Sequence, residues 1–168
     1  MLRTVIKTVQ LLNSETGPWQ LAFGASFGMV LGLTPLLNLH NLIVLLLICL
    51  LRVNISFVLL FMGLAAGFAY LLDGYFHQLG YQLLNSESLI PLWTDWYNHP
   101  LLRWSQFNNT VVLGSLVGAL IAFLPLALLV RLLVAQYRQR LQQKLEKTRF
   151  MQLLKASRWT EAVTKLGE

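Results

Sequence analysis

Hydrophobic residues in this chain gather into four runs separated by short polar stretches. The runs cover residues 19–37, 42–51, 55–72 and 111–130. A membrane-spanning helix needs about 20 apolar residues, and a chain of 168 residues is too short to bury all four runs in a soluble core. The pattern predicts an all-α integral membrane protein, a single membrane domain with four membrane segments.

Proline and polar residues place the ends of the first segments. After an amphipathic N-terminal segment (1–17), Thr16 and Pro18 are typical of a helix start, and Pro35 is typical of a helix end. Residues 18–72 are predicted to form a hairpin and then a span that Asp73 closes.

The rest of the chain divides in the same way. Residues 73–110 form a stretch rich in aromatic side chains, here called the cap, in which Pro91 and Pro100 are each expected to begin a helix. A return span (111–130) and a basic helical tail (131–168) follow.

The first two membrane segments are short. The run 42–51 is ten residues long, or about 15 Å of helix, against about 30 Å of hydrocarbon. Two structures fit this length. One is a pair of short spans in a locally thinned bilayer. The other is a re-entrant hairpin that turns at residues 35–41 and returns to the side from which it entered.

Charged residues orient the segments. The net charge is +6, and most of the 13 lysines and arginines lie in the tail, whereas Arg103 is the only basic residue of the cap. Because cytoplasmic flanks collect Lys and Arg, both termini are expected inside a bacterial inner membrane and the cap outside. The tail is expected to bind anionic membrane lipids.

Glycines recur four residues apart in three of the predicted helices. Small residues at this spacing let helix backbones approach closely in lipid. The pattern predicts helix packing within the chain, with a homo-oligomer face as the alternative. The glycines are Gly24, Gly28 and Gly32, then Gly63 and Gly67, then Gly114 and Gly118.

An inverted repeat is a further hypothesis. The sequence from Gly24 to Pro35 corresponds to the sequence from Gly114 to Pro125, with alanine at the third small position, and the two helices would run in opposite directions. Many transport folds use such pairs, and chance among glycine-rich helices is the alternative explanation.

A polar cluster lies at the predicted hairpin tip: Pro35, Asn38, His40 and Asn41. Polar groups at membrane depth usually face protein or a wet cavity, whereas at a tip in the headgroups they need no special role. If the tip is functional, we expect a wet crevice running toward Arg52. Arg52 and Asn54 are candidates for binding a lipid headgroup, and an ordinary boundary arginine is the alternative.

Other chemistry has little support in the sequence. No nucleophile–base motif, phosphate loop or metal-ligand spacing occurs, so no enzyme activity, metal or cofactor is predicted. The single cysteine, Cys49, lies in an apolar run and is expected to be structural. Leucines alternate with the basic residues of the tail, which favours lipid over nucleic acid as its partner.

Tryptophans are frequent in the cap, as they are at a membrane–water interface. Three of them are candidates for docking a partner: Trp93, Trp96 and Trp104.

Residues 21–54 resemble a family of small bacterial inner-membrane proteins of unknown function. The resemblance rests on a glycine-rich helix ending in Gly32-Leu33-Thr34-Pro35 and on an apolar run closing in Leu51-Arg52-Val53-Asn54. The most similar branch is often paired with large envelope proteins of the AsmA-like class, which are thought to pass lipid between membranes. The resemblance therefore implies a non-enzymatic inner-membrane component of envelope lipid transport that docks an AsmA-like periplasmic partner through the cap. The alternative is a stand-alone small-solute or lipid transporter that uses the hairpin as its gate.

Overall fold

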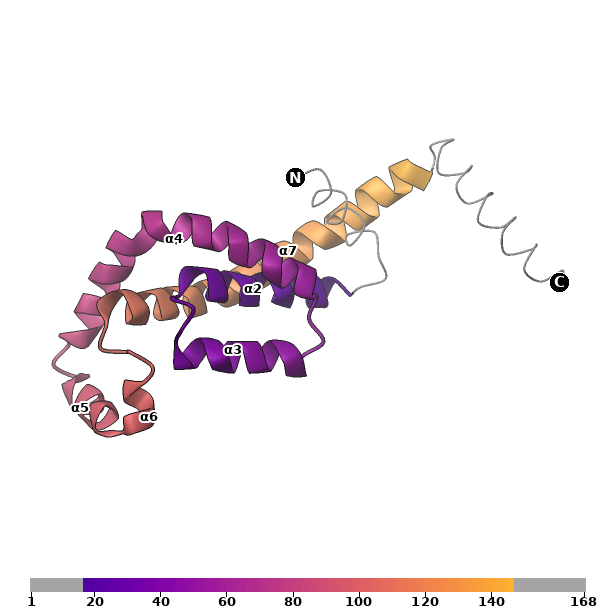
Figure 1. Ribbon diagram of the computed structural model, residues 1–168. Helices are drawn as coiled ribbons and strands as arrows, with labels where there is room; N and C mark the ends of the chain where they lie inside the picture. Colours follow the sequence, from indigo (N-terminus) through magenta and orange to yellow (C-terminus); the bar gives the residue numbers. More distant parts are fainter. Residues whose placement is uncertain (1–16, 147–168) are drawn as a thin grey trace, which may run out of the picture. The chain divides into compact units, whose positions relative to one another are not determined.

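A computed structural model describes residues 17–146, and all regular structure in this range is helical. The N-terminal amphipathic segment and Thr16, together with the tail beyond residue 146, lie outside the described residues. Figure 1 shows the order of the helices along the chain. The helices are α2 (Pro18–Leu33), α3 (Leu39–Leu50), α4 (Ile55–Leu84), α5 (Ile90–Asn98), α6 (Pro100–Arg103) and α7 (Thr110–Glu146).

Residues Thr16–Arg131 form one compact unit, and the end of α7 from Leu132 onward belongs to another. The first unit carries every packing contact and site described below. The second unit is described here only as the helical continuation of α7.

Helices α2 and α3 form the expected hairpin. Pro18 lies in the first turn of α2, and the backbone becomes extended at Thr34, directly before Pro35. The hairpin closes on itself, because the Asn54 backbone N–H donates to the Gln20 carbonyl at 3.2 Å. The chain therefore returns to the level at which α2 begins, as both hairpin alternatives require. In Figure 1, α2 lies between α3 and α4.

The glycines of α2 pack directly against the backbone of α4. A Cβ built at Gly24 would lie 2.7 Å from the Asn54 carbonyl oxygen, and one at Gly32 would lie 2.7 Å from the Ala65 Cβ. A Cβ at Gly28 would overlap the Val58 carbonyl oxygen. The two helices run parallel at backbone contact, which only glycine permits along this face.

A second tight crossing joins the end of α4 to the start of α7. A Cβ at Gly80 would overlap the Thr110 carbonyl, and one at Gly114 would overlap the Phe76 carbonyl and lie 3.0 Å from the Gly80 nitrogen. One turn further, a Cβ at Gly118 would lie 3.1 Å from the Phe76 ring. Helix α4 thus contacts α2 through its first half and α7 through its last turns.

Helix α7 also packs on α2 through an aromatic and polar contact. The buried Ser26 hydroxyl donates to the Phe123 carbonyl at 3.0 Å, and the Phe27 and Phe123 rings meet edge to face with centroids 5.0 Å apart. In the first turn of α2, the centre of the Trp19 ring lies 4.3 Å from the Arg131 guanidinium. This pair is a close cation–π contact.

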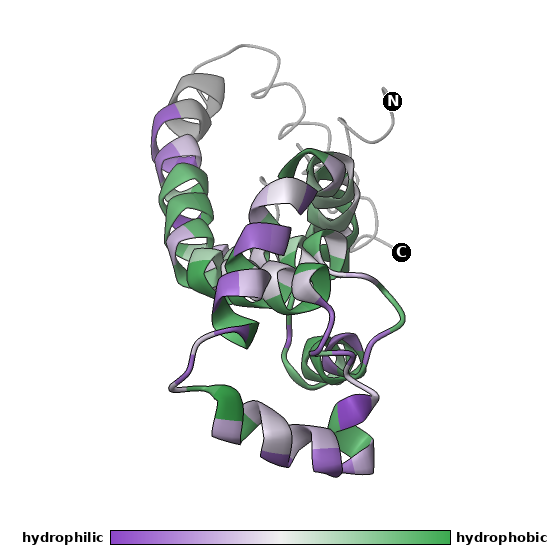
Figure 2. Ribbon diagram, turned by 90° about the vertical axis from the view of Figure 1, so that its left-hand side faces the viewer, coloured by the Kyte–Doolittle hydropathy of each residue, from purple (hydrophilic) through white to green (hydrophobic). Residues whose placement is uncertain are grey.

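Two of the described helices are long and apolar enough to cross a membrane, by length and composition. They are α4 and the Thr110–Arg140 part of α7. Only 17% and 22% of their most apolar windows are buried within the chain, so most of this apolar surface is exposed. Helix α3 is apolar and exposed along most of its length. Figure 2 shows hydrophobic positions on most turns of the helices.

The structure differs from three expectations. The helix that contains the predicted span 55–72 does not end at Asp73 but continues to Leu84, since a single exposed carboxylate does not end a helix. Gly63 and Gly67 do not pack against this chain, since a Cβ at either position meets no atom within 4 Å.

The third difference concerns the proposed inverted repeat, in which Pro35 and Pro125 do not occupy equivalent positions. Pro35 follows the end of α2, whereas Pro125 lies inside α7, which remains helical around it. The two prolines therefore have different structural roles, although the small residues before them match in spacing.

Candidate functional site

The hairpin tip is built around the carbonyl oxygen of Pro35. The side-chain amides of Asn38 and Asn41 both donate to this oxygen, at 3.0 Å and 2.9 Å. The Thr34 hydroxyl lies 2.9 Å from the Asn41 Oδ1 and 2.8 Å from the Val30 carbonyl, so its single proton is shared between two acceptors. The network gives the Pro35 carbonyl its partners and ties the segment that follows α2 to the first turn of α3.

Burial differs among the tip residues. The Asn41 side chain is 1% exposed, and its amide oxygen and nitrogen both have partners, which gives it a structural role. Asn38 is 7% exposed, and its Oδ1 has no hydrogen-bond partner among the described residues. The His40 Nε2 is likewise buried and without a partner. The structure therefore brings the predicted tip residues together and leaves two polar atoms unsatisfied.

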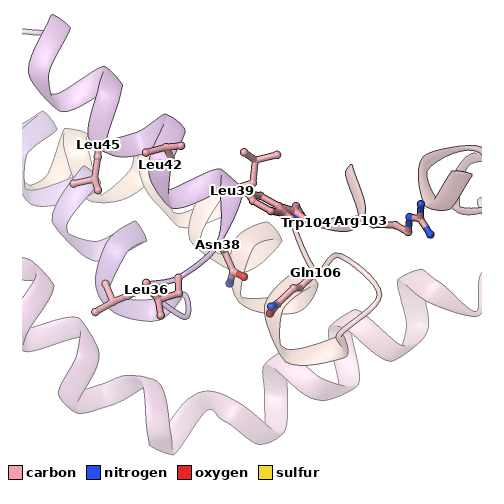
Figure 3. Close-up of a pocket in the computed structure, with 9 residues that line it drawn as sticks. Leu36, Asn38, Leu39, Leu42, Leu45, Arg103, Trp104 and Gln106 are labelled. Atoms are coloured by element: carbon pink, nitrogen blue, oxygen red, sulfur yellow. The ribbon is translucent and has the colours of Figure 1, made fainter. Parts of the chain in front are cut away.

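A groove of about 580 Å³ opens beside Asn38, between the start of α3 and the α6–α7 connection. Figure 3 shows Asn38 between the leucines of α3 and the side chain of Gln106. Arg52 does not line this groove, so the groove is not the crevice toward Arg52 that the sequence suggested, and it reaches the cap instead. The lining residues are Leu36, Leu37, Asn38, Leu39, Leu42, Leu45, Arg103, Trp104 and Gln106.

The other end of the hairpin carries Arg52 and Asn54. The Asn54 Oδ1 accepts from the Phe57 backbone N–H at 3.1 Å and caps α4. Its side chain is thus used as a helix cap. Arg52 is exposed in the turn that follows α3.

The three tryptophans of the cap differ in their packing and exposure. Trp93 and Trp96 pack with the buried Phe107, with ring centroids 5.4 to 5.8 Å apart, and the Trp93 indole N–H donates to the Leu83 carbonyl at 2.9 Å. These two side chains hold α5 against the entry to α7. Trp104 is 78% exposed and is the most accessible of the three predicted docking residues.

Several residues that matter in the structure were missed by sequence reasoning. Thr34 is the centre of the tip network, and a polar side chain next to Pro35 was the available signal. Gly80 packs against the α7 backbone at Thr110, and Phe107 is the buried centre of the cap. Neither lies in a local motif that marks it, because their partners are distant in sequence.

No group of three or more His, Cys, Asp or Glu side chains within residues 17–146 is arranged to hold a metal ion. Cys49 is exposed on α3. His77 Nδ1 lies 2.7 Å from the Thr110 hydroxyl, a contact that reinforces the α4–α7 crossing.

Comparisons with known proteins give one family and one relative. A family model described as an uncharacterized protein conserved in bacteria (DUF2062) matches residues 2–143. An uncharacterized protein of Treponema pallidum (strain Nichols) is 27% identical over 145 residues, which cover 86% of this chain and 90% of the relative. No solved structure matches the chain.

Proposed function

Since the chain belongs to a family of uncharacterized proteins conserved in bacteria (DUF2062), we propose that it is a non-enzymatic inner-membrane component of envelope lipid transport. In this proposal α2, α3, α4 and α7 are its four membrane segments. Both termini are cytoplasmic, and the cap docks a periplasmic partner.

The observation that carries the proposal is the exposed apolar surface of the cap. A docking subunit needs such a surface, whereas a transporter acting alone needs a polar path across the membrane. Five large apolar side chains of α5, α6 and the turn after them are exposed: Ile90, Leu92, Tyr97, Leu101 and Trp104. Large aromatic side chains are also the residues that most often anchor protein interfaces.

The two packing clusters support the same role. Trp93 and Phe107 fix α5 to the start of α7, and Gly80 fixes α7 to the end of α4. The cap is therefore attached to both long helices, so its exposed side chains are presented on a supported surface. A preorganised surface loses little entropy when it binds.

The nature of the partner comes from the family resemblance of residues 21–54. That resemblance implies an AsmA-like envelope protein, which would extend from the cap into the periplasm. Lipid would then pass from the membrane around α3 toward the partner. The α3 leucines and Trp104 line one groove, which supports this direction.

The alternative function is a stand-alone lipid or small-solute transporter gated by the hairpin. One observation favours it: the Asn38 Oδ1 and the His40 Nε2 are both buried without partners. Orphaned polar atoms of this kind destabilise the closed hairpin and would gain partners if it opened to water.

Site-specific photocrosslinking in cells separates the two functions. A benzoylphenylalanine at Leu101 should give an adduct with a large envelope protein of the AsmA-like class, identified by mass spectrometry. The control position is Tyr70, which is exposed on α4 within the proposed membrane span. If Leu101 gives no protein adduct, or only the adducts that Tyr70 gives, the docking function is wrong.

A further inference from the structure

The groove beside Asn38 has an apolar part and a polar part, as a phospholipid molecule has. Its apolar part is formed by successive turns of one face of α3, through Leu39, Leu42 and Leu45. Its polar part is formed by Asn38 from the hairpin tip, with Gln106 and Arg103 from the cap. In Figure 3 the α3 leucines, Trp104 and Arg103 follow one another along one side, and Asn38 and Gln106 lie on the other side.

The apolar part has room for a hydrocarbon chain. The leucines at 39, 42 and 45 recur at the spacing that places them on one helix face, and their turns span about 9 Å along α3. Leu42 and Leu45 are exposed, and Trp104 closes the groove from the cap side. A groove volume of about 580 Å³ exceeds the space needed for one acyl chain segment of this length.

One acceptor in the polar part of the groove has no hydrogen-bond donor. The Asn38 amide nitrogen is committed to the Pro35 carbonyl, which fixes the orientation of the side chain and leaves its Oδ1 as a buried acceptor without a partner. Water or a ligand that donates a proton at this position would satisfy it. Gln106 sits opposite with φ of 55°, a left-handed conformation that non-glycine residues rarely adopt.

Arg103 supplies the positive charge. It is the only basic residue of the cap, it lines the groove, and its guanidinium lies 5.6 Å from the centre of the Tyr97 ring. An exposed guanidinium held over an aromatic ring keeps its hydrogen-bond donors available for a phosphate.

We propose that this groove binds a single glycerophospholipid whose headgroup can donate a hydrogen bond. One acyl chain lies along Leu39, Leu42 and Leu45, and the phosphate binds Arg103. The headgroup ammonium or hydroxyl donates to the Asn38 Oδ1. The inference rests on the proposed function for the membrane placement of α3, and it names the class of lipid that the cap side of the hairpin selects.

The test uses the full-length protein in nanodiscs that carry a trace of phospholipid with a photoactivatable acyl chain. Three probes with identical chains are compared: phosphatidylglycerol, phosphatidylethanolamine and phosphatidylcholine. All three carry the phosphate, but the choline headgroup has no proton to donate. Adducts mapped by mass spectrometry should concentrate on residues 36–45 and Trp104. The first two probes should label these residues about fivefold more than phosphatidylcholine, as expected for one hydrogen bond.

Two arginine variants provide the matched control. Arg103→Gln should reduce labelling of the groove about tenfold, because a charge-assisted contact is lost. Arg52→Gln removes an exposed arginine beyond the opposite end of α3, outside the groove, and should leave labelling of the groove residues unchanged.

Two outcomes would overturn the lipid site. One is equal labelling over all exposed apolar faces of α3, α4 and α7, which is the behaviour of bulk bilayer lipid. The other is groove labelling that does not respond to Arg103→Gln or to the headgroup. These outcomes are separate from failure of the docking function, because the crosslink from Leu101 reports a protein partner and requires no bound lipid.

Discussion

Replacing Gly28 by alanine should destabilise this protein, whereas the same replacement at Gly67 should not. Both glycines lie within apolar helices at a four-residue glycine spacing, so the local sequence does not distinguish them. Only their surroundings differ. A Cβ at Gly28 meets the backbone of α4, and a Cβ at Gly67 meets nothing within 4 Å.

The size of the effect follows from the contacts at Gly28. The new methyl group would overlap the Val58 carbonyl oxygen and would lie 3.0 Å from both the Met62 nitrogen and the Val58 carbonyl carbon. Ordinary contacts of this kind are about 3.5–4.0 Å, so the two helices must separate by about 1 Å. Overpacking of this kind costs about 1–3 kcal/mol, and the contacts at Gly24 and Gly32 would loosen with it.

Helix propensity acts in the opposite direction at both sites. Alanine is favoured over glycine inside a helix by about 1 kcal/mol. At Gly28 this gain offsets part of the steric cost and leaves a net loss of up to about 2 kcal/mol, toward the upper end because the overlap is with backbone atoms. At Gly67 nothing opposes the gain, so Gly67→Ala should be neutral or stabilising by up to about 1 kcal/mol.

Reversible unfolding in mixed micelles of dodecyl maltoside and sodium dodecyl sulfate, followed by circular dichroism, measures the difference. Gly28→Leu extends the series and should prevent folding or reduce yield sharply. The reasoning is refuted if Gly28→Ala unfolds at the same detergent fraction as the parent protein. Equal destabilisation by Gly67→Ala would instead place Gly67 in a contact with a second copy of the chain.

Further predictions concern the hairpin tip and the topology. Thr34→Val keeps the shape but leaves the buried Asn41 Oδ1 without its donor, so the same unfolding assay should show a loss of about 1–2 kcal/mol, and Thr34→Ser should restore most of it. In a Cys49→Ala background, Leu37→Cys should react with a polar maleimide and Asn41→Cys should not, because the two side chains are 94% and 1% exposed; equal reaction would show that the tip opens. Reporter fusions should read periplasmic near Glu87 and cytoplasmic at the C-terminus, and a periplasmic signal at the C-terminus would overturn the proposed orientation.

The sequence determined the all-helical character of the described chain and most helix ends. Proline lacks a backbone donor and has a fixed φ, so its effect on the chain is local and can be predicted without knowing the neighbours. The starts of α2, α5 and α6 therefore follow from Pro18, Pro91 and Pro100, and the end of α2 follows from Pro35. The unbroken helix around Pro125 shows the limit of this reasoning, since a proline inside a helix can be accommodated by its surroundings.

The polar cluster at the tip was also predictable as a cluster, because Asn38, His40 and Asn41 are adjacent in sequence. Its internal arrangement was not. Asn41 is sealed and structural while Asn38 faces a groove, and this difference depends on Thr34 and on the approach of Gln106 from the cap.

Only the tertiary structure decided which glycines are contacts and which surfaces remain open. Gly28 and Gly67 have similar local sequences, and Gly80 lies in a stretch that was expected to be outside the membrane helices. Whether a glycine is needed depends on the position of another backbone, and Thr110 lies 30 residues from Gly80 along the chain. The same holds for the groove, whose leucines and arginine come from segments far apart in sequence. Hydrophobic burial is non-directional and fixes which residues leave water, whereas close packing is short-ranged and is fixed only when the helices meet.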